Sequence, residues 1–295
     1  MPRELGVPLS EEKFIDVNGI RTRYFEKGEG ETLLLLHGSF FGESFSSDCA
    51  ANWSENFEGL AEFARVIAVD RLGQGYTDNP KRIEDYTMKA VGEHVRDIIN
   101  TLNLGRVHIV GHSRGGYVAC RATLDYPDII KTCVIVDSGT LAPGTTPMHE
   151  IMAGAPKPNL TEESQRWVLR RYSFGDEHIT DEWVRALAAV AATPKYKEAA
   201  VIVEKSSYAA DLQREKGETF DLIRTRGIGK PTLVIWALND PTATIERGHL
   251  LFKAIAEKER QAEMHVFNKS GHFVYREYPK EFNALLKNWV SRHAD

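Results

Sequence analysis

The ten residues VHIVGHSRGG, at positions 107–116, predict the fold more clearly than any other stretch of the chain. Val107–Val110 is a continuous apolar run, as in a strand that is buried on both faces of a parallel sheet. Gly111–Gly115 then matches the pattern G-x-S-x-G, and a helical stretch, 114–126, follows it. The glycines permit a sharp turn that holds Ser113 at the top of the sheet, near the positive end of a helix dipole. The stretch therefore predicts a nucleophilic serine, with a plain glycine-rich turn as the alternative.

Further apolar runs lie on both sides of this stretch. They occupy 32–36, 65–69, 133–136, 232–237 and 263–267, with helical patterns at 88–102, 246–256 and 280–290. Two short strands around Asn18-Gly19, a strong hairpin signal, precede them. Strands that alternate with helices predict an α/β fold with a mostly parallel sheet covered on both faces.

The segment 141–219 interrupts this alternation. It opens with Pro143-Gly144 and reads as helices that carry Trp167, Tyr172, Trp183 and Tyr208, without a buried strand. We expect a core domain of residues 1–140 and 220–295, and a helical lid of residues 141–219 inserted between two strands. An ordinary helical subdomain without a gating role is the alternative.

Two residues that follow strands complete a candidate catalytic triad. A serine hydroxyl needs a base, and His272 in SGHF follows the last strand. Asp240 in WALND follows the strand before it, and would hold the imidazole in the correct tautomer. Asp137, which also ends a strand, is the alternative acid. The backbone amides of Ser39 and Arg114 are the expected oxyanion hole.

Composition excludes several classes of protein. The net charge of −5 argues against a nucleic-acid partner, and no CxxC pair occurs among Cys49, Cys120 and Cys133. No apolar run is long enough to span a membrane, and residues 1–14 lack the apolar core of a secretion signal, so a cytoplasmic location is expected. DRLGQG at 70–75 is not a dinucleotide-binding motif. We expect neither a cofactor nor a metal.

Five motifs occur in an order that resembles the α/β-hydrolase superfamily. They are HGSF (37–40), DRLGQG (70–75), GHSRGG (111–116), WALND (236–240) and SGHF (270–273). Within that superfamily the chain is similar to the meta-cleavage product hydrolases, which split C–C bonds in vinylogous diketone acids. The similarity covers Asn52-Trp53-Ser54, lid residues 171–182, and residues 265–267 and 281–283. The related phthalate monoester hydrolases cleave esters on the same scaffold.

Three positions depart from the C–C hydrolase pattern. His112 stands where that group usually has Asn, and Phe273 where it has Trp. The lid arginine that grips the dienoate carboxylate aligns with Leu187, and a buried carboxylate without a cation is costly. Arg114 and Arg185 are the candidates for holding a carboxylate instead, with a solvated or structurally paired side chain as the alternative. The pocket candidates are Phe40, His112, Trp183, Leu187 and Phe273.

These departures favour a cofactor-free serine hydrolase that cleaves a carboxylic ester of an apolar or aromatic small molecule through an acyl-enzyme on Ser113. A monoester that carries a carboxylate is one such substrate. C–C hydrolysis of a vinylogous diketone acid is the alternative, and a non-catalytic ligand-binding protein is a remote one. A homodimer is expected from the resemblance alone.

Overall fold

Eight strands form one sheet in the computed structural model, which describes residues 9–294. The strands are β1 (Lys13–Val17), β2 (Ile20–Lys27), β3 (Thr32–Leu36), β4 (Arg65–Val69), β5 (Val107–His112), β6 (Ile130–Val136), β7 (Thr232–Ala237) and β8 (Ala262–Phe267). Their order is β1-β2-β4-β3-β5-β6-β7-β8. The β1–β2 and β2–β4 pairs are antiparallel and the other pairs are parallel, which confirms the predicted α/β class.

The fully buried strands have mostly apolar sequences. Every residue of β3, β5 and β7 is buried, because helices cover both faces of the sheet there. In the central pairs Leu36 lies beside Gly111, and Gly111 beside Ile135. The carboxyl ends of β3, β5 and β6 are therefore level, and the loops that follow them meet at one edge of the sheet.

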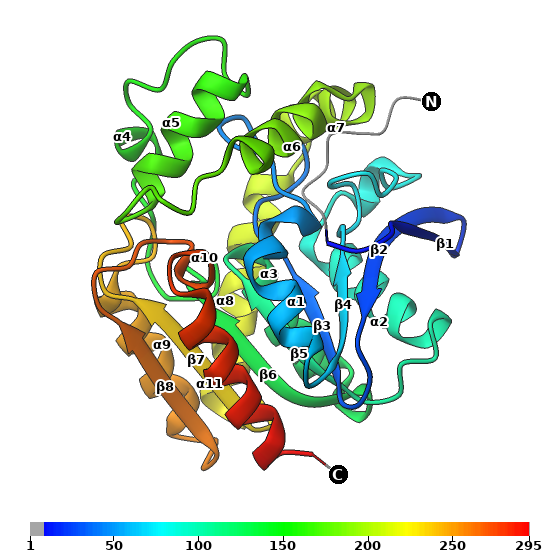
Figure 1. Cartoon of the computed structure of the whole chain (residues 1–295), viewed down its shortest axis with the longest axis vertical. Coiled ribbons are helices and arrows are strands. Elements are labelled where there is room, and N and C mark those ends of the chain that lie inside the picture. Colours follow the sequence, from blue (N-terminus) through cyan, green and yellow to red (C-terminus); the bar gives the residue numbers. More distant parts are fainter. Residues whose placement is uncertain (1–8, 295) are drawn as a thin grey trace.

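Two helical layers cover the sheet (Figure 1). On one face, α1 (Ser54–Ala61) and α11 (Pro279–Arg292) pack against side chains of the central strands. The other face carries α2 (Met88–Thr101), α3 (Arg114–Asp125), α8 (Tyr208–Arg226) and α9 (Ile245–Ala256). Short helices occur at η1 (Ala50–Trp53), η2 (Ile83–Asp85), η3 (Pro127–Ile129) and α10 (Val274–Glu277).

The inserted segment folds as helices above the carboxyl ends of the parallel strands (Figure 1). It contains α4 (Met148–Ile151), α5 (Glu162–Tyr172), α6 (Asp181–Ala192) and α7 (Pro194–Lys205) before α8 begins. Threonine side chains at 161, 180 and 193 cap α5, α6 and α7 by accepting a backbone N–H, which explains where these helices start. We call residues 141–207 the lid.

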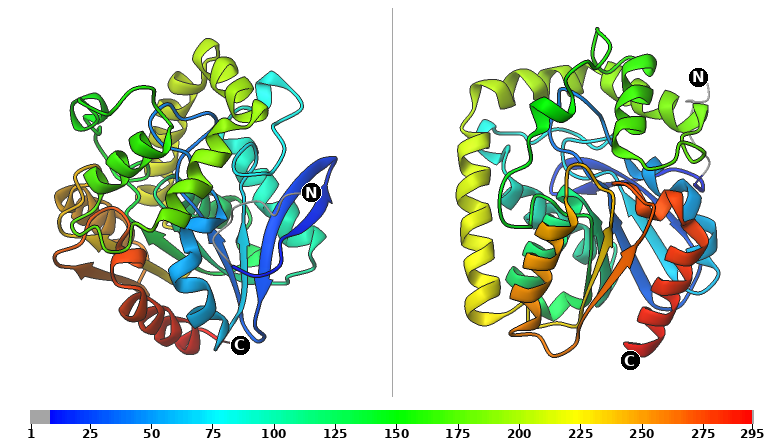
Figure 2. Two further views of the ribbon diagram at one scale, coloured as in Figure 1. Left: turned by 45° about the horizontal axis from the view of Figure 1, so that its top comes forward. Right: turned by 90° about the vertical axis from the view of Figure 1, so that its left-hand side faces the viewer.

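Helix α8 joins the lid to the core. It runs from the lid along the side of the sheet (Figure 2, right), so the domain boundary expected at residues 219 and 220 falls inside this helix. Residues 1–8 and 295 of the expected core domain, and with them most of the stretch examined for a secretion signal, lie outside the described residues. Among residues 9–294, no helix is both long and apolar enough to cross a membrane.

Candidate active site

Ser113 occupies a strained turn between β5 and α3. Its φ of 54° and ψ of −120° lie in a region that side chains rarely adopt. A Cβ on Gly111 would lie 2.1 Å from the Gly115 carbonyl oxygen, and one on Gly115 would lie 2.4 Å from that of Leu36. Only glycine fits at both positions, which is why the G-x-S-x-G pattern produces this turn. The Ser113 amide donates to the Val136 carbonyl (2.8 Å), which anchors the turn to β6.

His272 and Asp240 meet at the carboxyl edge of the sheet. The distance from His272 Nδ1 to Asp240 Oδ2 is 2.5 Å. Asp240 Oδ1 accepts hydrogen bonds from the backbone amides of Thr242 and Ala243 and from the Thr242 hydroxyl. Burial by itself would raise the pKa of Asp240, but His272 and these donors outweigh it and hold that pKa below its ordinary value. Asp240 is therefore a charged partner that orients the His272 imidazole.

Asp137, the alternative acid, forms a different hydrogen bond. Its Oδ1 accepts from the Ala237 amide (2.7 Å), and its Oδ2 has no hydrogen-bond partner among the described residues. Burial, together with the charge of nearby Asp240, raises its pKa well above the ordinary value. Of the two aspartates, Asp240 is the one that contacts the His272 imidazole, whereas Asp137 bonds to backbone.

The loop after β3 lies beside Ser113. The side chain of Arg71 donates to the carbonyls of Gly38 and Ser39 and so holds this loop in place. Ser39 has a φ of 62°, a left-handed conformation. Neither the Ser39 amide nor the Arg114 amide has a hydrogen-bond acceptor within residues 9–294, so both N–H groups remain available to an oxyanion.

A cavity of about 470 Å³ joins these groups. Ser113, His272, Ser39 and Arg114 all line it. The remaining lining comes from the loops after β3, β6, β7 and β8, from α8 and from the lid. It includes Phe40, Glu43, Asp48, Tyr172, Lys216 and Phe273. Its volume suits a single small molecule.

The cavity carries charges of both signs. Arg114 lies over the Phe40 ring (4.1 Å to the centroid) and donates to the Tyr208 hydroxyl, and no carboxylate of residues 9–294 forms an ion pair with it. Burial lowers the pKa of Lys216 to about 8. Burial also raises the pKa of Asp48 to about 6, although Asn52 and Arg71 favour its charged form. The cavity can therefore bind an anionic group through Arg114 and Lys216.

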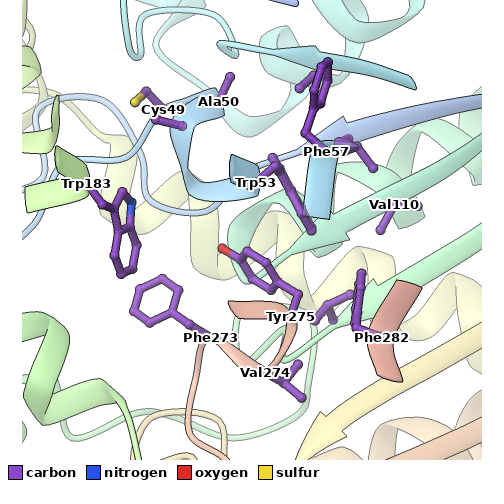
Figure 3. Close-up of a cluster of buried hydrophobic side chains, with 14 of the residues drawn as sticks. Cys49, Ala50, Trp53, Phe57, Val110, Trp183, Phe273, Val274, Tyr275 and Phe282 are labelled. Carbon is purple, nitrogen blue, oxygen red and sulfur yellow. The ribbon is translucent and has the colours of Figure 1, made fainter. Parts of the chain in front are cut away.

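Three of the five pocket candidates lie in the packed interior rather than on the cavity wall. Leu187 and Trp183 are fully buried on α6, and the Trp183 ring meets Phe273 edge-on at 5.1 Å (Figure 3). His112 is buried against His272 and Tyr275. Phe40 and Phe273 do line the cavity. Arg185, the second candidate for holding a carboxylate, lies on α6 of the lid. It pairs with Glu182 and does not line the cavity.

Several cavity residues escaped the sequence analysis. Asp48 and Glu43 line the cavity, and Thr242 bonds to Asp240, yet none of the three belongs to a recognisable motif. Only the proximity of Asp48 to the HGSF motif and of Thr242 to WALND could have drawn attention to them. Within the part of the chain that the structure describes, no group of three or more His, Cys, Asp or Glu side chains could hold a metal ion.

The comparison with known families agrees with this geometry. The alpha/beta hydrolase fold family model matches residues 31–279, which is most of the chain. The chain belongs to the α/β-hydrolase family. It is a hydrolase, and the alternative of a non-catalytic ligand-binding protein loses its support.

Three proteins similar to this α/β-hydrolase are themselves named as hydrolases. A 2-hydroxy-6-oxo-6-(2'-aminophenyl)hexa-2,4-dienoic acid hydrolase of Metapseudomonas resinovorans is 27% identical over 288 residues, covering 96% of this chain and 92% of that protein. A 2-hydroxymuconate semialdehyde hydrolase of Pseudomonas sp. strain CF600 is 26% identical, covering 92% and 91%. The structure of a meta-cleavage product hydrolase from Pseudomonas fluorescens IP01 superposes with a TM-score of 0.78 at 26% identity, covering 95% and 97%.

These relatives overturn the predicted preference for ester hydrolysis. The solved structure is named a meta-cleavage product hydrolase, the group that the sequence analysis kept as its alternative. The other two are named as hydrolases of a dienoic acid and of a hydroxymuconate semialdehyde, and none of the three is named an esterase. The esterase prediction relied on Leu187 standing where the C–C hydrolases have a lid arginine. In this hydrolase Leu187 lies in the core, whereas Arg114 and Lys216 line the cavity.

Proposed function

We propose that this α/β-hydrolase cleaves a C–C bond in a vinylogous diketone acid, a 2-hydroxy-6-oxohexa-2,4-dienoate. The observation that carries the proposal is the similarity to a dienoic acid hydrolase along 96% of the chain. The cavity supports it, since Ser113, His272 and two cations line one space. The catalytic roles of Ser113, His272 and Asp240 are part of the proposal.

In this mechanism Ser113 Oγ attacks the C6 carbonyl carbon, and its proton passes to His272. The amides of Ser39 and Arg114 stabilise the oxyanion. The step proceeds from the keto tautomer, in which the proton of the 2-hydroxyl group has moved to C5. The C5–C6 bond breaks, its electron pair passes through C4 and C3 to the 2-oxo oxygen, and that oxygen takes up the proton from His272. Water, deprotonated by His272, attacks the acyl group on Ser113 and releases the second product as a carboxylic acid. Asp240 stabilises the imidazolium that forms.

The test is a spectrophotometric assay with purified enzyme and coloured 6-phenyl and 6-methyl dienoates. We expect the visible absorbance to disappear while benzoate or acetate forms in equal amount with 2-hydroxypenta-2,4-dienoate. Chromatography of the products shows which bond broke. Persistence of both dienoates at micromolar enzyme, with the fold intact by circular dichroism, contradicts the proposal.

Replacing Arg114 with Met is expected to raise KM for the dienoate about tenfold, because a hydrogen bond to a charged group contributes about 1.5 kcal/mol. The backbone amide at 114 is retained, so kcat should change less than KM. Steady-state kinetics of the acid and of its methyl ester, which has no carboxylate charge, measure the difference.

The matched control for this prediction is Arg185→Met, which removes an arginine that pairs with Glu182 on the lid surface. Its KM should equal that of the unmodified enzyme. Equal KM values for the acid in the Arg114→Met and Arg185→Met variants would mean that Arg114 does not hold the substrate carboxylate.

A further inference from the structure

The loop that carries His272 is held by contacts from two directions. On the core side, His112 Nε2 donates to the His272 carbonyl (2.7 Å). On the lid side, the His272 amide donates to the Tyr172 carbonyl (2.8 Å). Burial lowers the pKa of His112 well below its ordinary value, so its ring stays neutral. The backbone of the proposed catalytic base is therefore bonded to the turn before Ser113 and to the lid at once.

The Glu277 carboxylate joins the His272 loop to the lid. Glu277 Oε2 accepts from the Gly271 amide (2.5 Å) and the Ser270 hydroxyl (2.8 Å), both on the His272 loop. Its other oxygen, Oε1, accepts from the Phe174 and Gly175 amides (2.6 and 3.1 Å), where α5 of the lid ends. The Glu277 side chain is 6% exposed. Each oxygen thus serves a different segment, and the carboxylate spans the gap between them.

The two segments are also in direct contact. A Cβ on Gly271 would lie 2.3 Å from the Tyr172 carbonyl oxygen and 2.7 Å from the Cα of Ser173. Any side chain at 271 would push the lid backbone away from the loop. Glycine at position 271 therefore allows the close contact between the loop and the lid, and the Glu277 carboxylate bonds the two segments together.

The charge of Glu277 is satisfied by hydrogen-bond donors rather than by a cation. His178 Nε2 lies 3.8 Å from it, but burial and the neighbouring Arg276 lower the pKa of His178 to about 3, so that ring is neutral. The Arg276 guanidinium is engaged by the Asn52 and His178 carbonyls. Both oxygens of Glu277 thus bond to the two backbone segments, and among residues 9–294 no Lys or Arg forms an ion pair with it.

We infer that Glu277 is a positioning residue, which fixes the His272 imidazole by tying its loop to lid residues 172–175. The end of α5 is then a fixed point of the lid, and the lid must be docked there for His272 to face Ser113. The inference rests on the catalytic role of His272 in the proposed function. Glu277 itself does not line the cavity and has no contact with the reacting atoms.

The experiment replaces Glu277 with Gln, which keeps the shape but turns an NH2 group toward two N–H donors. We expect kcat on the dienoate to fall ten- to a hundredfold with KM changed less than threefold, because small displacements of a catalytic group cost about that much. Hydrogen exchange should show faster exchange at the Phe174, Gly175 and Gly271 amides. Glu281→Gln, an exposed glutamate on α11, is the control and should change neither quantity.

Glu277→Asp is the second variant, in case the glutamine variant does not fold. It keeps both acceptor oxygens but is one methylene shorter and cannot reach both segments, so kcat should fall with the fold retained. An unchanged kcat, or a lower melting temperature with unchanged kcat for the folded fraction, overturns the inference. His272→Ala separates the two proposals: if that variant stays active, the proposed function fails, whereas an inactive His272→Ala with a fully active Glu277→Gln refutes the role of Glu277 alone.

Discussion

Replacing Asp240 with Asn is expected to lower kcat on the dienoate by a factor on the order of 10⁴, comparable with the effect expected for Ser113→Ala. The physical reason is the 2.5 Å contact between Asp240 Oδ2 and His272 Nδ1. An asparagine amide turned toward Nδ1 would donate where the carboxylate accepts, and would select the wrong imidazole tautomer. It would also leave the imidazolium without a negative partner. Steady-state and single-turnover kinetics measure the loss.

Asp137→Asn is the matched control, because both aspartates follow a strand at the same edge of the sheet. Asp137 bonds to the Ala237 amide, and burial raises its pKa, so a neutral asparagine of the same shape disturbs this position less than position 240. Its kcat should stay within about tenfold of the unmodified enzyme. The reverse ranking, with Asp137→Asn the more damaging change, would identify Asp137 as the acid of the triad.

Acid should destabilise this hydrolase steeply between pH 6 and pH 4. Burial lowers the pKa of His37 and His178 to about 3, of His94 to about 4, and of His112 well below its ordinary value of 6.5. Near pH 5 these four rings are neutral in the folded chain and protonated in the unfolded one. Unfolding therefore takes up about four protons, and stability rises with pH wherever the unfolded chain binds more protons.

Four carboxyls act in the opposite direction. Burial raises the pKa of Asp48 to about 6, that of Asp137 well above its ordinary value, and those of Glu43 and Glu215 above theirs, so these groups release protons on unfolding near pH 5. The net uptake is about one to two protons, which corresponds to a loss of about 1.4 to 3 kcal/mol in the free energy of unfolding for each pH unit. Urea denaturation at pH 7, 6 and 5 measures it. Equal free energies of unfolding at pH 7 and pH 5 would show that these histidines are not buried as neutral rings.

The residues that line the cavity could be predicted only in part from local sequence. Ser113, Asp240 and His272 each follow a strand, so their approach to one edge of the sheet could be predicted from strand periodicity and chain order. The direction of a lid side chain could not. Leu187 and Trp183 face the core, while Tyr172 faces the cavity, and this depends on how the lid helices pack above the sheet. The mistaken preference for esters relied on Leu187 as a pocket residue, and the direction of that side chain could not be read from the sequence.

The sequence by itself determined the strands, the serine turn, the hairpin and the family, because each depends on short-range features. Continuous apolar runs select buried strands, and a glycine pair permits one tight turn. Only the tertiary structure decided which cations line the cavity and how the His272 loop is held. Arg114 and Lys216 lie about a hundred positions apart in the chain, and Glu277 bonds to an amide at position 174. No local pattern encodes such contacts, because they form only when the lid docks on the folded core.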